Sequence, residues 1–216
     1  MTPRLHGDSG QAAPLYIAAV VGLLFLALMF FAFGQADVRR NETQTAADAA
    51  ALAAAKESRD GLDEVLRLNI LDPVWLGRLI DGTVGSPDTG CSEASRFAAE
   101  NGARSIGCAP LTDGRWGATV EVKSEKSVGK SIVEGTEGKY AEAKATAVVE
   151  PRCTFTPNEA TEEPPADGED EDPDEEEEKP SPGQFLCNGE KWVIDPTRLD
   201  LLPDMADLFD VHLAKD

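Results

Sequence analysis

One uncharged and almost wholly apolar stretch near the N-terminus constrains the fold of this chain more than any other feature. It runs from Leu15 to Phe33, 19 residues without an acidic or basic side chain. At a helical rise of about 1.5 Å per residue the stretch spans about 28 Å, close to the ~30 Å hydrocarbon thickness of a bilayer. Pro14 precedes it, where the first turn of a helix tolerates a missing N–H. The stretch therefore predicts a transmembrane helix.

A cleaved secretory signal peptide is the alternative interpretation of the same stretch. Ala32-Phe33-Gly34 and Gly34-Gln35-Ala36 both place small residues at the spacing that signal peptidase prefers. However, the apolar run is longer than the roughly 7–15 residues of a signal peptide, and the head before it carries a single arginine. We therefore favour an uncleaved anchor.

Two signals disagree about which side of the membrane the C-terminal part occupies. Arg39 and Arg40 follow the span and outnumber Arg4 before it, which alone favours a cytoplasmic C-terminal part. Four cysteines lie after the span, and an even number suits two disulfides outside the reducing cytoplasm. They are Cys91, Cys108, Cys153 and Cys187. We give the cysteines more weight and predict a single-pass protein of the cell membrane, with a cytoplasmic N-terminus and an extracellular C-terminal domain.

Composition argues against several classes of function. With 40 acidic and 20 basic residues the formal net charge is −20, so binding to nucleic acid phosphates is not expected. The chain has only two histidines, which makes histidine-based triads and multi-histidine metal sites hard to build. Gly129-Lys130-Ser131 resembles the end of a phosphate-binding loop, but Ser124 stands where that motif needs glycine. We predict no enzymatic activity, cofactor, metal or small-molecule substrate.

Beyond the span, an alanine-rich segment predicts one unbroken helix to about Arg59. It contains no proline, and glycine first returns at Gly61. Four of its alanines recur at i, i+3, i+4, i+7 spacing, namely Ala47, Ala50, Ala51 and Ala54. Such a stripe lets another helix approach closely. The other interpretation is a stalk in which the alanines only stabilise the helix.

The residues around this stripe carry a resemblance to a known family. A head GDSGQAAP and the apolar span are followed by the string R-x-x-x-Q-x-A-A-D-A-A-A-L-A-A-A, in which Arg40, Gln44 and Asp48 accompany the alanines. This order resembles the TadE/TadG-like proteins of tight-adherence (Flp) pilus assembly. It is most similar to the TadG-related proteins of actinobacteria such as Streptomyces, as is the ending WVIDPTRLDLLPDMADLFDVHL.

The resemblance implies a single-pass membrane protein with an exported domain, working beside a type IV-like pilus or secretion apparatus. Its partners would be the membrane and other pseudopilin-like or Tad-system membrane proteins, against whose helices the alanine stripe would pack. Flp prepilins are cleaved after a glycine and carry a glutamate five residues further on, whereas Leu15 and Ala12 stand at that distance from Gly10 and Gly7. We therefore expect an uncleaved accessory component.

The remaining sequence predicts an α+β fold with a small core. Short helices are expected around residues 62–70, from Asp72-Pro73, and over residues 92–101. Alternating apolar and polar residues predict strands at residues 116–122 and 140–149. A short hairpin at residues 185–194 is expected to rejoin the domain. Pro203 is expected to open a C-terminal helix with one apolar face, formed by Leu202, Met205, Leu208, Phe209 and Leu213.

The cysteines and the acidic run complete the predicted domain. We favour the sequential pairing Cys91–Cys108 and Cys153–Cys187, although four cysteines allow three pairings. A zinc site would need closely spaced cysteine pairs, which the sequence lacks. The segment 157–183 holds the acidic run and predicts a disordered spacer, while loose Ca²⁺ binding is the less favoured alternative.

These observations divide the chain into six expected parts. They are a cytoplasmic head (1–13), a transmembrane helix (14–36), a helical stalk (37–60), an exported α+β domain (61–156), an acidic linker (157–183) and a C-terminal hairpin and helix (184–216). The function we expect is a non-enzymatic accessory component of a Tad/Flp-like pilus assembly or secretion system. The alternative is a secreted or anchored envelope-binding protein, for cell wall or cations, that uses residues 1–36 only for export.

Overall fold

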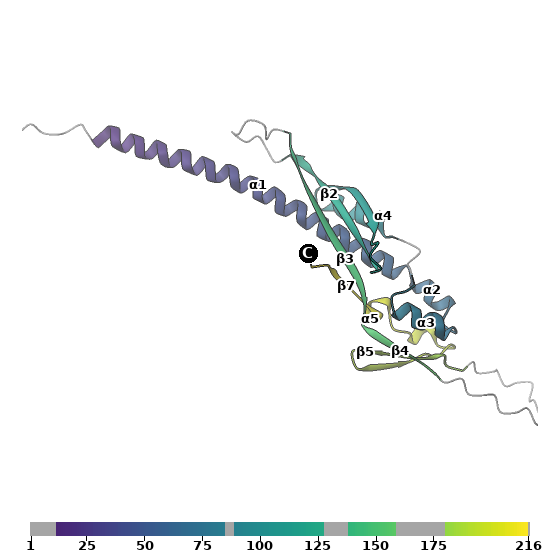
Figure 1. Ribbon diagram of the computed structural model, residues 1–216. Helices are drawn as coiled ribbons and strands as arrows, with labels where there is room; N and C mark the ends of the chain where they lie inside the picture. The colour runs from purple at the N-terminus through teal and green to yellow at the C-terminus, as the bar shows by residue number, and fades with distance from the viewer. Residues whose placement is uncertain (1–11, 85–88, 128–137, 159–179, 216) are drawn as a thin grey trace, which may run out of the picture.

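A single long helix forms the axis of the computed structural model, which describes residues 12–84, 89–127, 138–158 and 180–215. Helix α1 (Ala12–Asp60) has 49 residues and is about 73 Å long at the standard rise. It ends at Gly61, whose N–H still donates to the carbonyl of Glu57. Figure 1 shows the other elements gathered along its C-terminal part, while its N-terminal part extends away from them. The predicted unbroken helix is confirmed.

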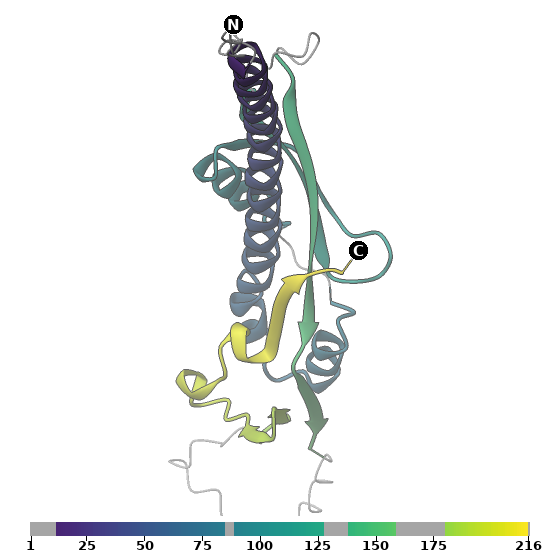
Figure 2. The ribbon, with the colours of Figure 1, turned by 90° about the vertical axis from the view of Figure 1, so that its left-hand side faces the viewer.

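A four-stranded antiparallel sheet lies along the C-terminal part of α1 (Figure 2). We call it the large sheet; its strands are β1 (Ala103–Pro110), β2 (Gly117–Ser127), β3 (Tyr140–Pro151) and β7 (Phe209–Leu213), in that order. Alternate residues of β2 are buried, among them Ala118, Val120 and Val122. The alternation confirms the predicted strand, and its buried face lies against α1, which the sequence did not predict.

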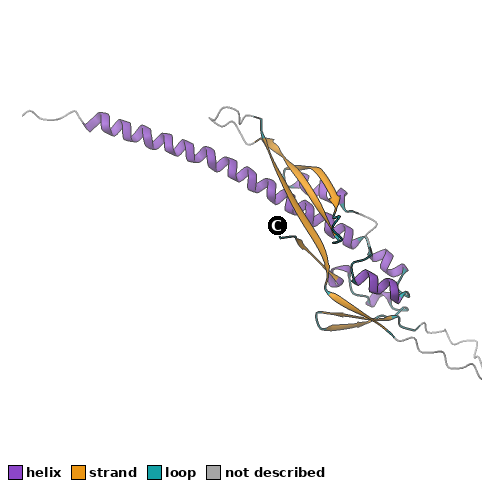
Figure 3. Cartoon of the chain, viewed as in Figure 1, coloured by secondary structure: helices purple, strands orange, loops and turns teal. Residues whose placement is uncertain are grey.

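A smaller three-stranded sheet stands at the end of the molecule away from the N-terminus (Figures 1 and 3). This small sheet contains β4 (Cys153–Pro157), β5 (Gly183–Cys187) and β6 (Glu190–Val193). Strands β5 and β6 form the hairpin expected near residues 185–194, and β4 pairs with β5 along its whole length. Phe155 on β4 and Phe185 on β5 are directly opposite, and the centres of their rings lie 5.5 Å apart.

Three short helices follow α1 in the chain and precede the first strand. They are α2 (Asp63–Leu68), α3 (Pro73–Ile80) and α4 (Cys91–Glu100). The carboxylate of Asp72 accepts hydrogen bonds from the N–H groups of Val74 and Trp75, so it caps α3 as expected. The α+β fold class is therefore confirmed, with one hydrophobic core that includes α1 and both sheets.

The C-terminal segment differs from the prediction. Only Met205–Leu208 is helical (α5), after a 3₁₀ turn at Leu199–Leu201, and Phe209 begins strand β7. Phe209 pairs with Pro151 and Leu213 with Ala147, so the chain extends the large sheet instead of forming a second apolar helix face. Met205, Leu208 and Phe209 are buried as expected. Their spacing favours a helix, but hydrogen bonding to the edge of β3 makes the chain a strand from Phe209 onwards. Most of the predicted acidic spacer lies outside the described residues.

Candidate functional site

The N-terminal part of α1 is a long apolar surface that the rest of the described chain leaves uncovered. Ala13–Phe31 is long and apolar enough to cross a membrane, and none of it is buried. Leu15 is 75% exposed and Phe30 79% exposed. Large side chains exposed all round a helix are unfavourable in water and suit lipid or helical partners. We call Ala13–Phe31 the apolar segment.

A short polar junction separates the apolar segment from the folded part. Arg39 donates to the carboxylate of Glu42 at 2.6 Å, whereas Arg40 is exposed and has no ionic partner among the described residues. Thr43 is the first buried side chain among the described side chains of α1, and its hydroxyl donates to the carbonyl of Arg39. The junction therefore places cations just beyond the apolar segment, where a membrane-crossing helix would meet lipid headgroups.

The alanine stripe is the contact between α1 and the rest of its own domain. Its members are wholly buried, as are their neighbours: Ala46, Ala47, Ala50, Ala51, Ala54 and Ala55 all have 0% exposure. Strands β3 and β2 and helix α4 cover them. At Gly90, which begins α4 in a left-handed conformation, an added Cβ would collide with the backbone of Ala54. Small side chains therefore let α1 lie almost in backbone contact with its own fold.

This finding corrects both sequence interpretations of the stripe. Ala47, Ala50 and Ala54 are unavailable to helices of other subunits, because sheet and α4 already occupy that face. They are also more than stalk-forming residues, because they form part of the main hydrophobic core. The stripe positions the domain on the helix.

The polar residues of the family string have separate roles. The Gln44 amide donates to the Asp48 carboxylate at 2.8 Å and to the carbonyl of Lys144 on β3 at 3.2 Å. Strand β7 pairs with β3 only between Ala147 and Pro151, so Lys144 lies on a stretch of β3 edge that β7 does not reach. The structure thus brings Gln44 and Asp48 together at an otherwise open strand edge, while Arg40 points into solvent.

The C-terminal end of α1 is fastened by a contact that sequence reasoning missed. The indole N–H of Trp116 donates to the hydroxyl of Ser58 at 2.9 Å, and its ring meets Phe209 edge-on at 5.2 Å. The three residues come from the last turn of α1, from the position before β2 and from the start of β7. No spacing in the sequence links them, since the contact depends on how the chain folds back.

Two disulfides hold the outlying parts of the fold. Cys91 at the start of α4 is joined to Cys108 on β1, and Cys153 on β4 to Cys187 on β5, where the two residues are directly opposite. The structure therefore has two disulfides in the sequential pairing. Helix α4 and strands β4 and β5, which carry three of these cysteines, lie away from the apolar segment (Figure 1).

One face of the C-terminal part of α1 stays accessible. Asn41 and Thr45 are exposed, and one and two turns further on Ala49 and Leu52 are half-buried. These four residues lie on one side of the helix by their spacing, opposite the buried alanines. We call them the outer face of α1; it continues the line of the apolar segment into the folded domain.

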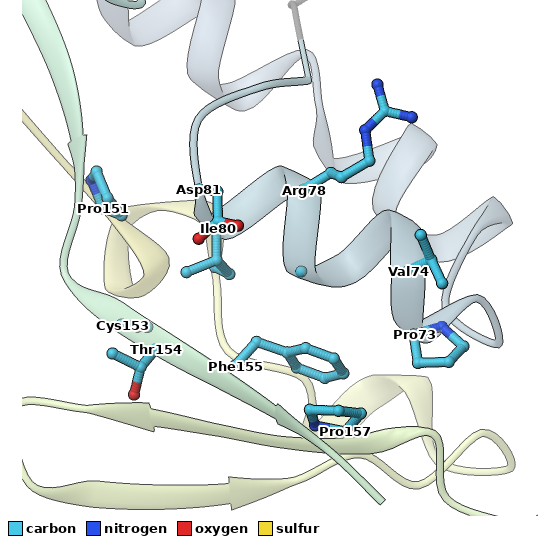
Figure 4. Close-up of a pocket in the computed structure, with 11 residues that line it drawn as sticks. Pro73, Val74, Arg78, Ile80, Asp81, Pro151, Cys153, Thr154, Phe155 and Pro157 are labelled. Carbon is cyan, nitrogen blue, oxygen red and sulfur yellow. The ribbon is translucent and has the colours of Figure 1, made fainter. Parts of the chain in front are cut away.

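A groove between α3 and β4 is a concave site of about 860 Å³. Its lining is mainly apolar, with the Phe155 ring directed towards Pro73 and the Arg78 side chain directed away from β4 (Figure 4). No group of three or more His, Cys, Asp or Glu residues is placed to hold a metal in the described part of the chain.

Several ionisable side chains of the described residues form surface ion pairs. A hydrogen bond from Arg96 lowers the pKa of Glu93, and hydrogen bonds from Arg115 lower the pKa of Asp113. Both pairs lie at solvent-exposed positions along a helix or turn. Ion pairs of this kind contribute little to stability and create no acid or base poised near neutral pH.

Comparison with known families concerns the same helix. Residues 10–57 match a family model described as putative Flp pilus-assembly TadE/G-like. Over these residues the chain is similar to that family. The match covers less than a quarter of the chain and includes the apolar segment, the junction and the alanine stripe. Comparison with curated proteins and with solved structures finds no match.

Proposed function

We propose that this chain is a membrane-anchored, non-enzymatic accessory component of a Tad/Flp-like pilus assembly or secretion system. One observation carries the proposal: the TadE/G-like match at residues 10–57 coincides with α1, whose apolar segment is fully exposed. The apolar segment would cross the membrane, and the domain built around the alanine stripe would be presented on the other side. The cysteines support an extracellular domain with the N-terminus in the cytoplasm, because disulfides persist outside the reducing compartment.

Assembly would use the outer face of α1 in place of the alanine stripe. The four members of this face are uncharged, Glu42 and Asp48 lie at its two borders, and the face is in line with the apolar segment. A neighbouring Tad-system membrane protein could therefore follow α1 from the bilayer into the domain along a strip of uncharged side chains. Burial of the opposite side fixes which face is presented.

Substitution of Thr45 by arginine tests this assignment. Thr45 is exposed, and its hydroxyl donates only to the carbonyl of Asn41 within the helix, so Thr45→Arg leaves the domain folded. We expect the variant to remain in the membrane but to lose its Tad-system partners on co-purification from the native host after cross-linking. Thr156→Arg on β4 is the matched control and should retain them. Normal recovery of partners with Thr45→Arg would refute the outer-face assignment.

The groove beside α3 favours a second candidate function, a released envelope-binding protein. Its apolar lining and volume of about 860 Å³ suit a bound ligand, and residues 1–36 would then serve only for export. The intact mass of protein from membrane and medium separates the two. A membrane-bound species near 23.0 kDa supports the anchored assembly component. A shorter species in the medium, beginning at Gln35 or Asp37, supports the released protein.

A further inference from the structure

Strand β4 is paired along one edge only. The small sheet has the order β4-β5-β6, so the other edge of β4 has no strand beside it in the described part of the chain. The N–H of Asn158 donates to the carbonyl of Pro182, so even-numbered residues of β4 and β5 bond to each other. The N–H of Ile194 donates to the carbonyl of Gly183, so odd-numbered residues of β5 bond to β6. The N–H and C=O of Phe155 therefore point away from β5.

The backbone of Phe155 has no hydrogen-bond partner at this open edge. Neither its N–H nor its C=O bonds to another described residue. Backbone donors and acceptors are strong hydrogen-bonding groups, and on an edge strand they form a template for one more strand. The open edge of β4 is therefore complementary to an extended polypeptide.

The other edge strands carry features that discourage such pairing, whereas β4 carries few. Arg104 and a bulge lie on β1, Asp210 lies on β7, and Glu190 lies on β6. Strand β4 has no charged side chain and pairs with β5 without a bulge, and Pro157 stands only at its end. Charged side chains and bulges protect natural edges from a further strand. Of the described edge strands, β4 is therefore the least protected.

The groove between α3 and β4 follows this open edge. Cys153 and Phe155 line the groove, and so does Thr154, whose side chain points to the opposite face of the strand. No described residue of β5 lines it. A site that is lined from both faces of one strand, and not by that strand's partner, lies along the free edge. Figure 4 shows α3 on one side of β4 and the paired strands on the other.

The wall of the groove opposite β4 is apolar and leaves room for a chain. Val74 on α3 is 71% exposed, and the Phe155 ring is directed towards Pro73 (Figure 4). Gly77, one turn after Val74, has no side chain, and a Cβ added there would lie 3.9 Å from the Phe155 ring. The groove thus offers backbone bonds on one side and apolar contacts on the other. An extended peptide uses both, because its backbone bonds to the edge strand while alternate side chains enter the groove.

The charges of the chain favour a basic peptide. The formal net charge is −20, and the sequence from 159 to 178, joined to β4 through Asn158, has 13 carboxylates and no lysine or arginine. Within the lining, Arg78 and Asp81 carry opposite charges. The negative charge of the protein attracts a cationic partner and repels an acidic one. A second copy of this chain is repelled for the same reason.

We propose that the groove between α3 and β4 binds an extended, basic peptide segment of another protein, which adds to β4 as a fourth strand of the small sheet. Its backbone bonds to the N–H and C=O of Phe155, and alternate apolar side chains pack against Val74 and the Phe155 ring. The small sheet stands at the end of the molecule away from the N-terminus (Figure 1). The inference goes beyond the functions proposed above, because it holds whether the chain is anchored or released.

Peptide selection on the full-length protein in detergent tests the proposal. A phage-displayed library of short random peptides is selected on the parent protein and, in parallel, on Gly77→Leu. The leucine fills the groove, and because its Cβ lies at an ordinary contact distance from Phe155 and leucine favours a helix, the fold is kept. Ala99→Leu, at an exposed position of α4, is the matched control.

We expect the parent and Ala99→Leu to enrich the same peptides, and Gly77→Leu to enrich none of them. The enriched sequences should have apolar residues at alternate positions and an excess of lysine and arginine. Their binding should weaken as the salt concentration rises. A melting temperature of Gly77→Leu no lower than that of the parent excludes unfolding as the cause.

N-methylation of the strongest synthetic binder tests the strand geometry on the parent protein alone. A strand presents every second N–H to its neighbour, so methyl groups on those amides block bonding to β4, whereas methyl groups on the amides between them point away from it. We expect the affinity, measured by isothermal titration, to fall about tenfold at each sensitive position, with a period of two residues.

Each contrary result overturns a separate part of the proposal. If the parent enriches no peptide relative to Gly77→Leu, the groove does not bind peptides. Methylation that weakens binding at every position, or at none, refutes addition as a strand. Enrichment of acidic peptides refutes the charge preference. If the parent dimerises in sedimentation velocity and Gly77→Leu does not, the occupant is a second copy instead of another protein. None of these results bears on membrane retention, so the proposed assembly function is tested separately.

Discussion

The apolar segment and the alanine stripe belong to one continuous helix, α1. The faces through which they make contact are both nearly uncharged, yet one part is exposed and the other is buried. The apolar segment carries large aliphatic and aromatic side chains on every side and is wholly exposed. The alanine stripe carries methyl groups and is wholly buried. Side-chain size therefore decides the partner: large residues hold a neighbouring backbone at a distance and suit lipid, whereas alanine admits a sheet and α4 to near contact.

Replacing alanine by leucine in each part of α1 tests this difference most directly. Ala47→Leu, Ala50→Leu and Ala54→Leu together should abolish folding of the domain. Each overpacks the core by about 1–3 kcal/mol, against a total stability of about 5–15 kcal/mol for a typical domain. Ala27→Leu, in the apolar segment, should leave the domain unchanged. Circular dichroism and thermal unfolding in detergent measure both, and a triple variant that melts like the parent would contradict the buried stripe.

Removal of the disulfides should have the next largest effect, confined to the domain. Replacing both Cys91 and Cys108 by serine opens a loop of 17 residues and should cost about 3 kcal/mol. Replacing Cys153 and Cys187 opens a loop of 34 residues and should cost slightly more. Urea unfolding measures the loss, and membrane retention should not change. An unfolding midpoint equal to that of the parent would show that the disulfides do not stabilise the fold.

A smaller effect is expected at the C-terminal end of α1. Trp116→Phe keeps an aromatic ring against Phe209 but removes the N–H that donates to Ser58. The loss should be about 1 kcal/mol in the free energy of unfolding. Trp192→Phe is the matched control, because Trp192 lies on β6 and forms no hydrogen bond through its indole among the described contacts. Equal losses for the two variants would mean that the Ser58 contact does not fasten the helix.

Acid should have the smallest effect, and we expect it through an ion pair of α4. The pKa of Glu93 lies below its ordinary 4.5 in the folded protein because Arg96 donates to its carboxylate. This ion pair stabilises the fold fully above that ordinary value, and its contribution is lost as the pH falls through the lowered pKa. We therefore expect the melting temperature of the domain to fall slightly below about pH 4.5, and Glu93→Gln to reduce the slope. A slope unchanged by Glu93→Gln would contradict this role.

Local signals in the sequence predicted much of the fold. The long helix, the Asp72-capped helix α3, helix α4, strands β2 and β3 and the β5–β6 hairpin follow from periodicity and capping, which act between near neighbours. Strand β7 was missed because Met205, Leu208 and Phe209 have helical spacing. The structure from Phe209 onwards is decided instead by the edge of β3, with which this segment pairs. At that edge Pro151, the partner of Phe209, lies 58 residues earlier in the chain.

The candidate site was predicted in part, for the same reason. The exposed apolar segment and the importance of the alanine stripe were readable from composition and from the family string. The elements that cover the stripe could not be predicted, because small residues at helical spacing suit a sheet as well as a second helix. The bonds from Gln44 to Lys144 and from Trp116 to Ser58 join positions 100 and 58 residues apart, and no local pattern encodes them.

Hydrogen–deuterium exchange of the full-length protein in lipid nanodiscs tests the division of α1 most directly. Peptides from residues 15–31 and 43–58 are followed in buffer and in urea sufficient to unfold the large sheet. We predict that both are protected in buffer, and that in urea residues 43–58 exchange together with β2 and β3 while residues 15–31 stay protected. Protection of residues 43–58 after the sheet has unfolded, or exchange of residues 15–31 with the sheet, would contradict the account.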